Sequence, residues 1–246
     1  MAVVGTELLG ERVWVGTTYD GAAPRALRER RLRNAGATLA RLHAAVELEA
    51  HGRFVPGGDG PRPVADLPFD AVGRWDEMLL DVVEGWREDL PSRVAQLGDA
   101  VAETLRTHRE AFAGRPATLV HGDYAGHNLL FDGAAVAAVL DWEMAFAGAG
   151  EFDRWRAEQA LFEGAPPVEP DDDLRTEFRA GYESVRPADA GSATRGAAYR
   201  AMLALSPLAH IDAWPESVDR EQWLDHYETF VPEQLAAAGA GLEGSE

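Results

Sequence analysis

The stretch of sequence that decides the fold is residues 119–153, LVHGDYAGHNLLFDGAAVAAVLDWEMAFAGAGEFD. It continues an apolar run at residues 117–120, which predicts a short buried strand. This strand delivers His121, Gly122 and Asp123 to a loop in which polar side chains gather. Polar loop residues that are positioned by a rigid strand commonly carry function. We therefore expect the functional site at this loop.

A β-hairpin is expected directly after the loop. Residues 128–131 and 134–140 have the composition of two short strands, and Asp132-Gly133 between them predicts a tight turn. The second strand returns the chain to Asp141. The hairpin therefore brings Asp141 back toward the loop.

Three oxygen-bearing side chains are expected to meet there. Asp123 and Asn128 lie five residues apart, and Asp141 follows the returning strand. Two carboxylates and an amide are hard oxygen donors, which suit Mg²⁺ together with phosphate oxygens and water. The spacing is also that of a kinase catalytic loop, in which an Asp accepts a hydroxyl proton and an Asn ligates the metal. Taken singly, the three residues could equally be a turn-forming Asp and the polar ends of a surface hairpin.

The combined pattern is HGDxxxxN followed by DWE at residues 141–143, and it resembles the aminoglycoside phosphotransferase and choline-kinase-like family. Gly122 stands where protein kinases carry Arg, and the Glu-Phe-Asp ending at Asp153 agrees with the resemblance. The helix that ends in Leu-Ala-Arg-Leu-His at His43 is also similar to the helix after the hinge in this family. The resemblance covers nearly the whole chain. It implies an α+β, protein-kinase-like fold in which a mainly helical C-terminal lobe carries a small hairpin at the catalytic loop.

The resemblance implies a role for each residue of the motif. Asp123 resembles the catalytic base, which must lie within about 3 Å of the acceptor hydroxyl. Asn128 and Asp141 resemble the Mg²⁺ ligands. Asp153 resembles the buried carboxylate that anchors the backbone of the catalytic loop.

Two further residues are expected to support these groups. His121 fixes the loop through the hydrogen bonds of its ring, and Glu143 assists at the metal. The resemblance implies a phosphotransferase that moves the γ-phosphoryl group of ATP or GTP, with Mg²⁺, to a substrate hydroxyl. The expected partners are therefore a nucleotide and a small hydroxyl-bearing molecule.

The sequence departs from the family at its N-terminal side. Family members have a β-rich lobe with a phosphate-covering loop and a Lys that contacts the phosphates, whereas all 23 basic residues here are Arg. Arg does not replace Lys without altered geometry. Residues 1–23, with a hairpin expected at 2–19, are interpreted as a remnant of that lobe, and residues 24–246 as the helical phosphotransferase lobe. Either an upstream part is missing, or this relative uses other contacts, or it has become a nucleotide-binding, metabolite-binding or scaffold module.

The rest of the chain is predicted to be largely helical, because apolar residues recur at steps of three and four. A Gly- and Pro-rich loop is expected at residues 51–63. His43 is expected in the core or at a helix end. Helices are predicted at residues 24–43, 69–86, 94–112, 174–182, 197–209 and 223–230.

A hypothesis of another class is a metal-dependent hydrolase. His121, Asp123, His127 and Asp141 have the side-chain types of a Zn²⁺ or Mn²⁺ site. This hypothesis leaves the hairpin and its Asn without a role, so it ranks below the phosphotransferase.

Charge and composition limit the partners. The net charge of −19 repels nucleic acid and anionic membranes. No apolar run approaches the roughly 18 residues of a membrane span, and without Cys there are no disulfides, so we expect a cytoplasmic protein. An acidic, lysine-free composition is typical of halophilic proteins, in which salt screens the self-repulsion. Carboxylates on the helical part would favour a cationic acceptor only if the acidic residues cluster there and are not simply spread over the whole chain. The candidates are Asp171, Asp172, Glu177 and Asp212.

Overall fold

The computed structural model describes residues 16–55, 64–162, 172–189 and 191–242. Their contacts form two compact units. The first unit comprises the described parts of residues 1–71, 116–164 and 169–188, and the second comprises those of 72–115 and 189–246. All the candidate site residues belong to the first unit, and each unit is described by itself below.

A five-stranded sheet in the first unit carries the strand that leads to the loop. Its order is β1(Glu47–Leu48), β4(Ala117–Val120), β7(Phe146–Ala149), β2(His51–Phe54) and β3(Phe69–Val72). β4 pairs antiparallel with β1 on one side and with β7 on the other. β4 is buried along its whole length, so the loop that follows it has a rigid support.

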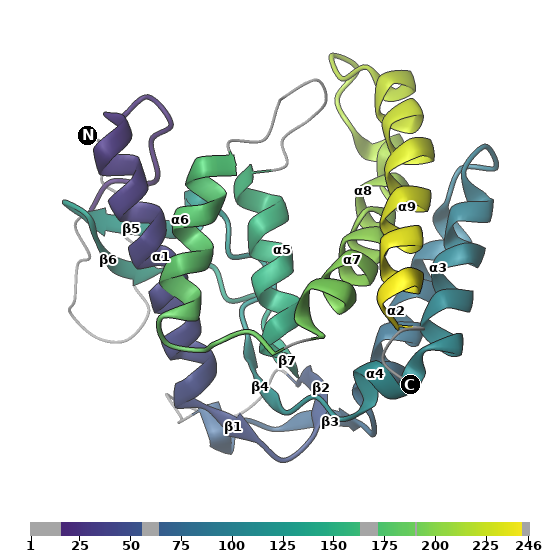
Figure 1. Cartoon of the computed structure of the whole chain (residues 1–246), viewed down its shortest axis with the longest axis horizontal. Coiled ribbons are helices and arrows are strands. Elements are labelled where there is room, and N and C mark those ends of the chain that lie inside the picture. The colour runs from purple at the N-terminus through teal and green to yellow at the C-terminus, as the bar shows by residue number, and fades with distance from the viewer. Residues whose placement is uncertain (1–15, 56–63, 163–171, 190, 243–246) are drawn as a thin grey trace. The chain divides into compact units, whose positions relative to one another are not determined.

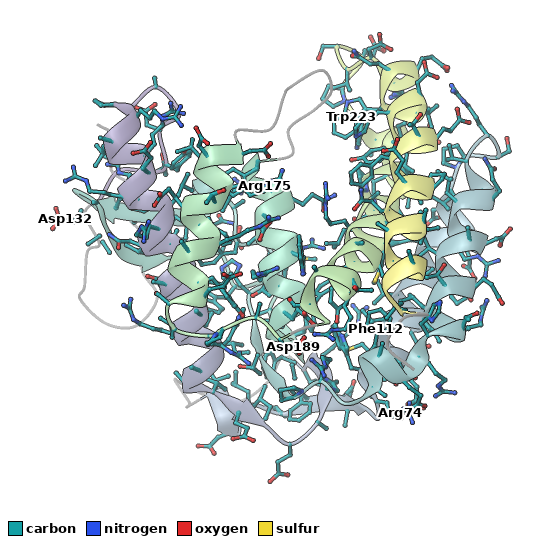
Figure 2. The ribbon with its side chains drawn as sticks, viewed as in Figure 1. Arg74, Phe112, Asp132, Arg175, Asp189 and Trp223 are labelled. Atoms are coloured by element: carbon teal, nitrogen blue, oxygen red, sulfur yellow. The ribbon has the colours of Figure 1, made fainter. Side chains whose placement is uncertain are left out.

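The predicted hairpin is present as β5(Leu129–Asp132) and β6(Ala135–Val139), paired antiparallel from Leu129↔Val139 to Asp132↔Ala135. Asp132 lies at its outer tip (Figure 2), and Gly133 takes the positive φ of 58° that the turn requires. Thr17 forms a bridge to Phe131 on the outer side of β5. The remainder of the hairpin expected at 2–19 lies outside the described residues.

Helices α1(Arg25–Ala45), α5(Gly150–Phe162) and α6(Asp172–Glu183) lie together with this hairpin in Figure 1. α1 and α6 are in close backbone contact: a Cβ on Gly36 would lie 2.0 Å from the Phe178 oxygen, and one on Gly181 would lie 1.9 Å from the Arg33 oxygen. Only glycine permits such an approach. The apolar core of the unit lies along this contact and includes Leu32, Leu39, Leu129, Phe131 and Phe178.

Arg31 joins α1 to the hairpin. Its Nε donates to the Gly133 oxygen at 2.9 Å and its Nη2 donates to Thr17 Oγ1 at 3.1 Å. The guanidinium lies 5.0 Å from the centre of the Phe131 ring. Arg31 is only 7% exposed, so the hairpin is held to the helix by a largely buried arginine.

The second unit is helical. Its helices are α2(Trp75–Asp89), α3(Ala95–Thr107), α4(Arg109–Ala113), α7(Ser192–Leu203), α8(Leu205–Ala209) and α9(Arg220–Leu242). α2 packs on α3, and α7 packs on α9. Inside the unit, the indole Nε1 of Trp75 donates to Tyr199 Oη at 3.0 Å. No helix in the described ranges has both the length and the apolar character needed to cross a membrane.

The α+β fold class and the predicted helix at 24–43 are confirmed, but two predicted elements differ. Residues 51–54 form β2 instead of a loop, and residues 69–72 form β3 instead of the first turn of a helix. The ring of Phe69 packs edge-on against that of Phe54 across the sheet. The helix begins only at Trp75, where Arg74 and Glu77 cap it.

Three other differences concern a break in a helix, an additional strand and the length of the last helix. The helix predicted over residues 94–112 is interrupted at His108, which separates α3 from α4. β7 was not predicted, because its Phe-Ala-Gly-Ala sequence has little of the composition that favours strands. α9 extends from Arg220 to Leu242, well beyond the predicted 223–230. The boundary expected at residue 23 remains a prediction.

Candidate active site

The loop after β4 turns sharply at Gly122. This residue has a φ of 79°, a conformation that residues with a Cβ rarely adopt. A Cβ at this position would also lie 2.3 Å from the backbone oxygen of Met144. Glycine is therefore required at residue 122 for two separate reasons. The turn leads directly into Asp123.

His121 connects this loop to the end of the hairpin. Its Nε2 lies 2.9 Å from the Leu140 oxygen, and its Nδ1 lies 3.2 Å from the backbone nitrogen of Asp123. Because a carbonyl accepts and an amide donates, Nε2 carries the proton and Nδ1 accepts. Both ring nitrogens are therefore engaged, which fits the expected supporting role of His121.

Asn128 lies at the end of a short 3₁₀ turn, Gly126–Asn128, and holds Asp123 directly. Its Nδ2 donates to the backbone oxygen of Asp123 at 2.9 Å and to the carboxylate Oδ2 at 2.8 Å. The Leu140 amide donates to the Asn128 backbone oxygen at 2.8 Å. The structure thus brings Asp123 and Asn128 together, and it ties Leu140, the residue before Asp141, to Asn128 and to His121.

The Asp123 carboxylate is held on one side only. Its side chain is 36% exposed, and Oδ2 accepts the Asn128 amide. Within the described part of the chain, no group donates a hydrogen bond to Oδ1. His127 is exposed, with Nε2 3.7 Å from Asp123 Oδ2. The free oxygen is available to a substrate hydroxyl.

Residues 141–144 are exposed on the other side of the site. Asp141 has a φ of 60°, which is unusual for a residue other than glycine. The Trp142 ring lies 4.6 Å from the His121 ring, and its Nε1 donates to the Val139 oxygen at 3.0 Å. The Glu143 side chain makes no hydrogen bond or ion pair to any described residue. Its expected role at the metal therefore stays a prediction.

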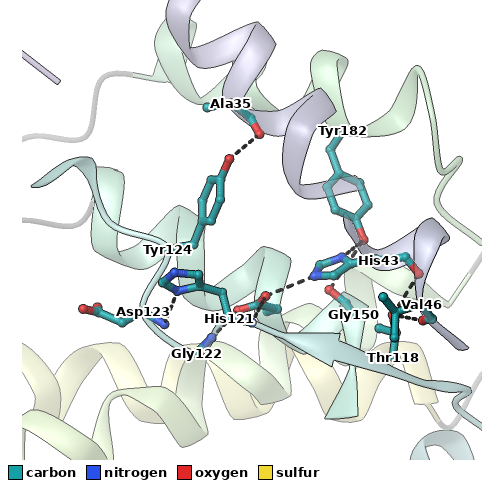
Figure 3. Close-up of polar contacts among 11 residues, drawn as sticks. Ala35, His43, Val46, Thr118, His121, Gly122, Asp123, Tyr124, Gly150 and Tyr182 are labelled. Atoms are coloured by element: carbon teal, nitrogen blue, oxygen red, sulfur yellow. Dashed lines mark hydrogen bonds and ion pairs between the residues drawn. The ribbon is translucent and has the colours of Figure 1, made fainter. Parts of the chain in front are cut away.

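Asp153 lies behind the loop and is fully buried. Its Oδ2 accepts from the His121 backbone amide at 2.8 Å, and its Oδ1 accepts from the Gly122 amide at 3.1 Å. His43 Nε2 lies 3.0 Å from Oδ2 (Figure 3). Burial would raise the pKa of the Asp153 carboxyl, but its bonds to His43 and the two amides outweigh burial and lower that pKa. The carboxylate is thus a charged anchor for the loop backbone.

The oxygen donors of the site fit Mg²⁺ better than they fit a hydrolase metal. No three His, Asp or Glu side chains in the described residues come close enough to hold an ion. The constellation of His121, Asp123, His127 and Asp141 required by the hydrolase hypothesis is therefore not formed. Mg²⁺ needs only one or two protein carboxylates when phosphates complete its shell. The Asn128 Oδ1 and the exposed Asp141 carboxylate are suitable donors.

Sequence reasoning missed two residues at this site. Arg156 follows Asp153 by one turn of α5, is half-buried, and makes no hydrogen bond or ion pair to a described residue. Burial lowers its pKa, against the opposing effect of the nearby Asp153 and Asp123 charges. His43 was expected in the core, but its contact with Asp153 was not. The only feature of the sequence that could have placed Arg156 near the site is its position three residues after Asp153, which puts both on the same face of a helix.

The fold is similar to that of several solved structures, although the sequence identities are low. One neighbour is a choline/ethanolamine kinase family protein from Mesorhizobium loti, with 15% identity and a TM-score of 0.55 over 88% of this chain and 66% of that one. Another is a thermostable mutant of aminoglycoside phosphotransferase APH(4)-Ia in a ternary complex with ADP and hygromycin B. It has 16% identity and a TM-score of 0.54 over 94% of this chain and 70% of that one.

The phosphotransferase enzyme family, APH, matches residues 2–188, so the chain belongs to this family. A homoserine kinase from Hyphomonas neptunium (strain ATCC 15444) is 26% identical over 181 residues, which are 71% of this chain. The match spans about half, 51%, of that kinase.

Proposed function

We propose that the protein is a small-molecule phosphotransferase that moves the γ-phosphoryl group of ATP or GTP onto a substrate hydroxyl. The observation that carries this proposal is the pair of hydrogen bonds from Asn128 Nδ2 to Asp123. One of them holds the carboxylate oxygen Oδ2, and the other carboxylate oxygen, Oδ1, is left free. This arrangement at the end of a buried strand is what a general base requires. Family membership supports the same reaction class.

In the proposed reaction, Asp123 accepts the proton of the acceptor hydroxyl. The acceptor oxygen forms a bond to the γ-phosphorus, and the bond from that phosphorus to the bridging oxygen breaks. The electron pair of the broken bond leaves with the nucleoside diphosphate. Protonated Asp123 then returns its proton to water.

Asn128 and Asp141 would hold Mg²⁺ through Oδ1 and the carboxylate, respectively. Bound Mg²⁺ would neutralise the phosphate charge and fix its orientation. Asp141 follows a residue that hydrogen-bonds to both His121 and Asn128. These bonds support a fixed distance between the metal ligands and the base.

Arg156 is the cation that we propose to counter the phosphate charge near Asp123. The sequence holds no Lys for this purpose. Burial lowers the pKa of Arg156, the charges of the nearby Asp153 and Asp123 oppose that lowering, and Arg156 has no ion-pair partner among the described residues. A phosphate oxygen would provide that partner.

The test is nucleotide consumption over a panel of hydroxyl compounds, in high potassium salt, with Asp123→Asn as the variant. We expect transfer to fall about 10²- to 10⁴-fold, because the amide cannot accept the proton. Asp132→Asn, at the exposed tip of the hairpin, is the matched control and should keep full activity. Equal rates for wild type and Asp123→Asn would refute the assignment of the base.

The second candidate is a relative that binds Mg²⁺–nucleotide without transfer, and the absence of Lys favours it. Titration calorimetry distinguishes the two. Saturable binding of Mg²⁺–nucleotide with no consumption over the whole panel would support the binding module and overturn the enzyme.

A further inference from the structure

The residue after the candidate base points into the core, and its hydroxyl group has a partner there. Tyr124 follows Asp123 directly and is 0% exposed, whereas the Asp123 side chain is 36% exposed. The Tyr124 Oη donates to the backbone oxygen of Ala35 in α1 at 2.9 Å (Figure 3). Two consecutive residues thus have opposite tasks, because one side chain is open to substrate and the next is fixed to a helix.

The chemistry of the two partners fixes the direction of this hydrogen bond. Burial raises the pKa of Tyr124, and the nearby Asp153 charge raises it further, so the hydroxyl keeps its proton. A carbonyl oxygen can only accept. The Ala35 oxygen has two lone pairs and can also accept the helical bond from the residue one turn later. The bond from Tyr124 is therefore an addition to α1, and the helix does not depend on it.

Ala35 is a firm attachment point. It is fully buried, and it precedes Gly36, where a Cβ would lie 2.0 Å from the Phe178 oxygen and 2.9 Å from the Tyr182 nitrogen of α6. Because no side chain fits between the two backbones, α1 has little freedom to shift at this point. The Tyr124 hydroxyl is thus bonded to a part of α1 that is itself held in place.

The ring of Tyr124 does not fix this position by itself. It meets the His121 ring edge-on, with 5.8 Å between the ring centres and 86° between the planes, and it belongs to the apolar core of the first unit. Dispersion contacts of this kind have little direction and tolerate small sliding movements, whereas a hydrogen bond weakens steeply with angle. The hydroxyl group therefore limits how far residues 123 and 124 can slide along α1.

We propose that the Tyr124 hydroxyl is a positioning group for the candidate active site: by holding residue 124 to α1, it sets where the adjoining Asp123 carboxylate lies. Asn128 fixes the direction of that carboxylate, and Tyr124 fixes the backbone from which it extends. The inference rests on the proposed function only where activity is measured. The hydrogen bond itself is a property of the folded chain without substrate.

The test variant is Tyr124→Phe, which removes one oxygen atom and keeps the ring. Ala35 keeps its helical bond, so we expect a folded variant with an unfolding midpoint within about 4 °C of wild type. Amide hydrogen exchange by NMR, on the full chain without nucleotide, reports on the loop. The bonded amides of Asp123 and Ala125 should exchange at least about threefold faster, while Leu119 in β4 is unchanged. Unchanged exchange at both loop amides would overturn the proposal.

The second measurement is the split between kcat and KM. Tyr124→Phe should lower kcat about 3- to 10-fold, with the KM of nucleotide and of acceptor within about twofold, because a displaced base slows chemistry more than binding. Replacement of Tyr124 by 4-aminophenylalanine keeps an N–H donor at the same point of the ring and should recover most of kcat. Replacement by 4-fluorophenylalanine fills the space without donating and should not. Equal kcat for the 4-amino and 4-fluoro proteins would assign the position a packing role alone and overturn the proposal.

Tyr199→Phe is the matched control. Tyr199 is also 0% exposed, and its Oη accepts from Trp75 Nε1 at 3.0 Å, but both residues belong to the second unit. This variant should leave exchange at Asp123 and Ala125 unchanged. The same acceleration in both variants would show a general loosening of the chain and would count against Tyr124.

The two kinds of measurement separate this inference from the proposed function. If wild type transfers no phosphoryl group, the proposed function fails, while the exchange data still decide on Tyr124. If Tyr124→Phe does not fold, the 4-amino and 4-fluoro proteins take its place in the exchange measurement. Faster exchange at the loop amides in the 4-fluoro protein alone would then support the proposal, and equal exchange would overturn it.

Discussion

The two sides of the candidate site are held in different ways. Behind the loop, Asp153 is fully buried and accepts three N–H donors. In front, residues 141–144 are exposed, and Asp141 has a backbone conformation that is unfavourable for its residue type. The difference indicates that the position of the base is fixed by the folded core, whereas the proposed metal ligand is left open to incoming phosphates. Substitutions behind the loop should therefore cost much more stability than substitutions in front of it.

The largest effect is expected for Asp153→Asn. The amide would place an NH₂ group against at least one of three N–H donors, in a site without water access. We expect the free energy of unfolding to fall by about 3–5 kcal/mol, measured by urea denaturation. Asp189→Asn is the control, since the Asp189 side chain is 52% exposed and pairs with Arg115 and Arg195 (Figure 2). Its cost should be about 1 kcal/mol or less, and equal costs would contradict the anchor role of Asp153.

The next effect is expected at the turn of the loop. Gly122→Ala combines a positive φ with a Cβ 2.3 Å from the Met144 oxygen, and we expect a loss of about 2–4 kcal/mol. Gly133→Ala has a similar φ but open space around the Cβ. Its loss of stability, expected at about 1 kcal/mol, therefore measures the cost of the backbone conformation alone. Thermal unfolding of both variants gives the difference. If the two variants lose the same stability, the close approach to Met144 is not a constraint.

Acid should remove the stability that the buried Asp153 carboxylate provides. The pKa of Asp153 is lowered in the folded state, so its charged form contributes stability that is fully present above the ordinary carboxyl pKa of about 4. That contribution is lost as the pH falls through the lowered pKa of the folded protein. We expect the unfolding free energy of wild type to drop more steeply with acid below about pH 4 than that of Asp153→Asn. Parallel curves for the two proteins would contradict the prediction.

The smallest effect on stability is expected at the open side. Asp141→Gly relieves the positive φ and should change the unfolding free energy by only about 1 kcal/mol in either direction, the relief being offset by added chain entropy. It should nevertheless abolish saturable Mg²⁺–nucleotide binding in calorimetry. Asp132→Gly, at the hairpin tip without positive φ, should be destabilising by about 0.5–1 kcal/mol and should keep binding. A large loss of stability in Asp141→Gly would show that this side is also part of the folded core.

Local spacing predicted the loop and the hairpin, and the resemblance implied the buried anchor Asp153, but neither predicted the contact of Asp153 with His43. Asp123, Asn128 and the hairpin follow from local spacing, because strand, turn and loop residues are close in the chain. The contact of His43 with Asp153 joins positions 110 residues apart, and helical periodicity shows only that His43 faces the core. β2 and β3 were missed for a similar reason. Their pairing depends on a neighbouring strand, while Phe69 and Val72 also fit a helical step.

The contact of Arg31 with the hairpin should respond to salt and acid differently from the exposed ion pairs. The exposed ion pairs of a chain with a net charge of −19 weaken as salt rises, and they break when acid protonates their carboxylates. Arg31, itself 7% exposed, instead bonds to a carbonyl and a hydroxyl and lies over the ring of Phe131, and none of these partners titrates. Arginine also keeps its charge throughout the range in which proteins fold. The attachment of the hairpin to α1, and with it the placement of Asn128 and Asp141, should therefore be indifferent to both salt and acid for as long as the first unit stays folded.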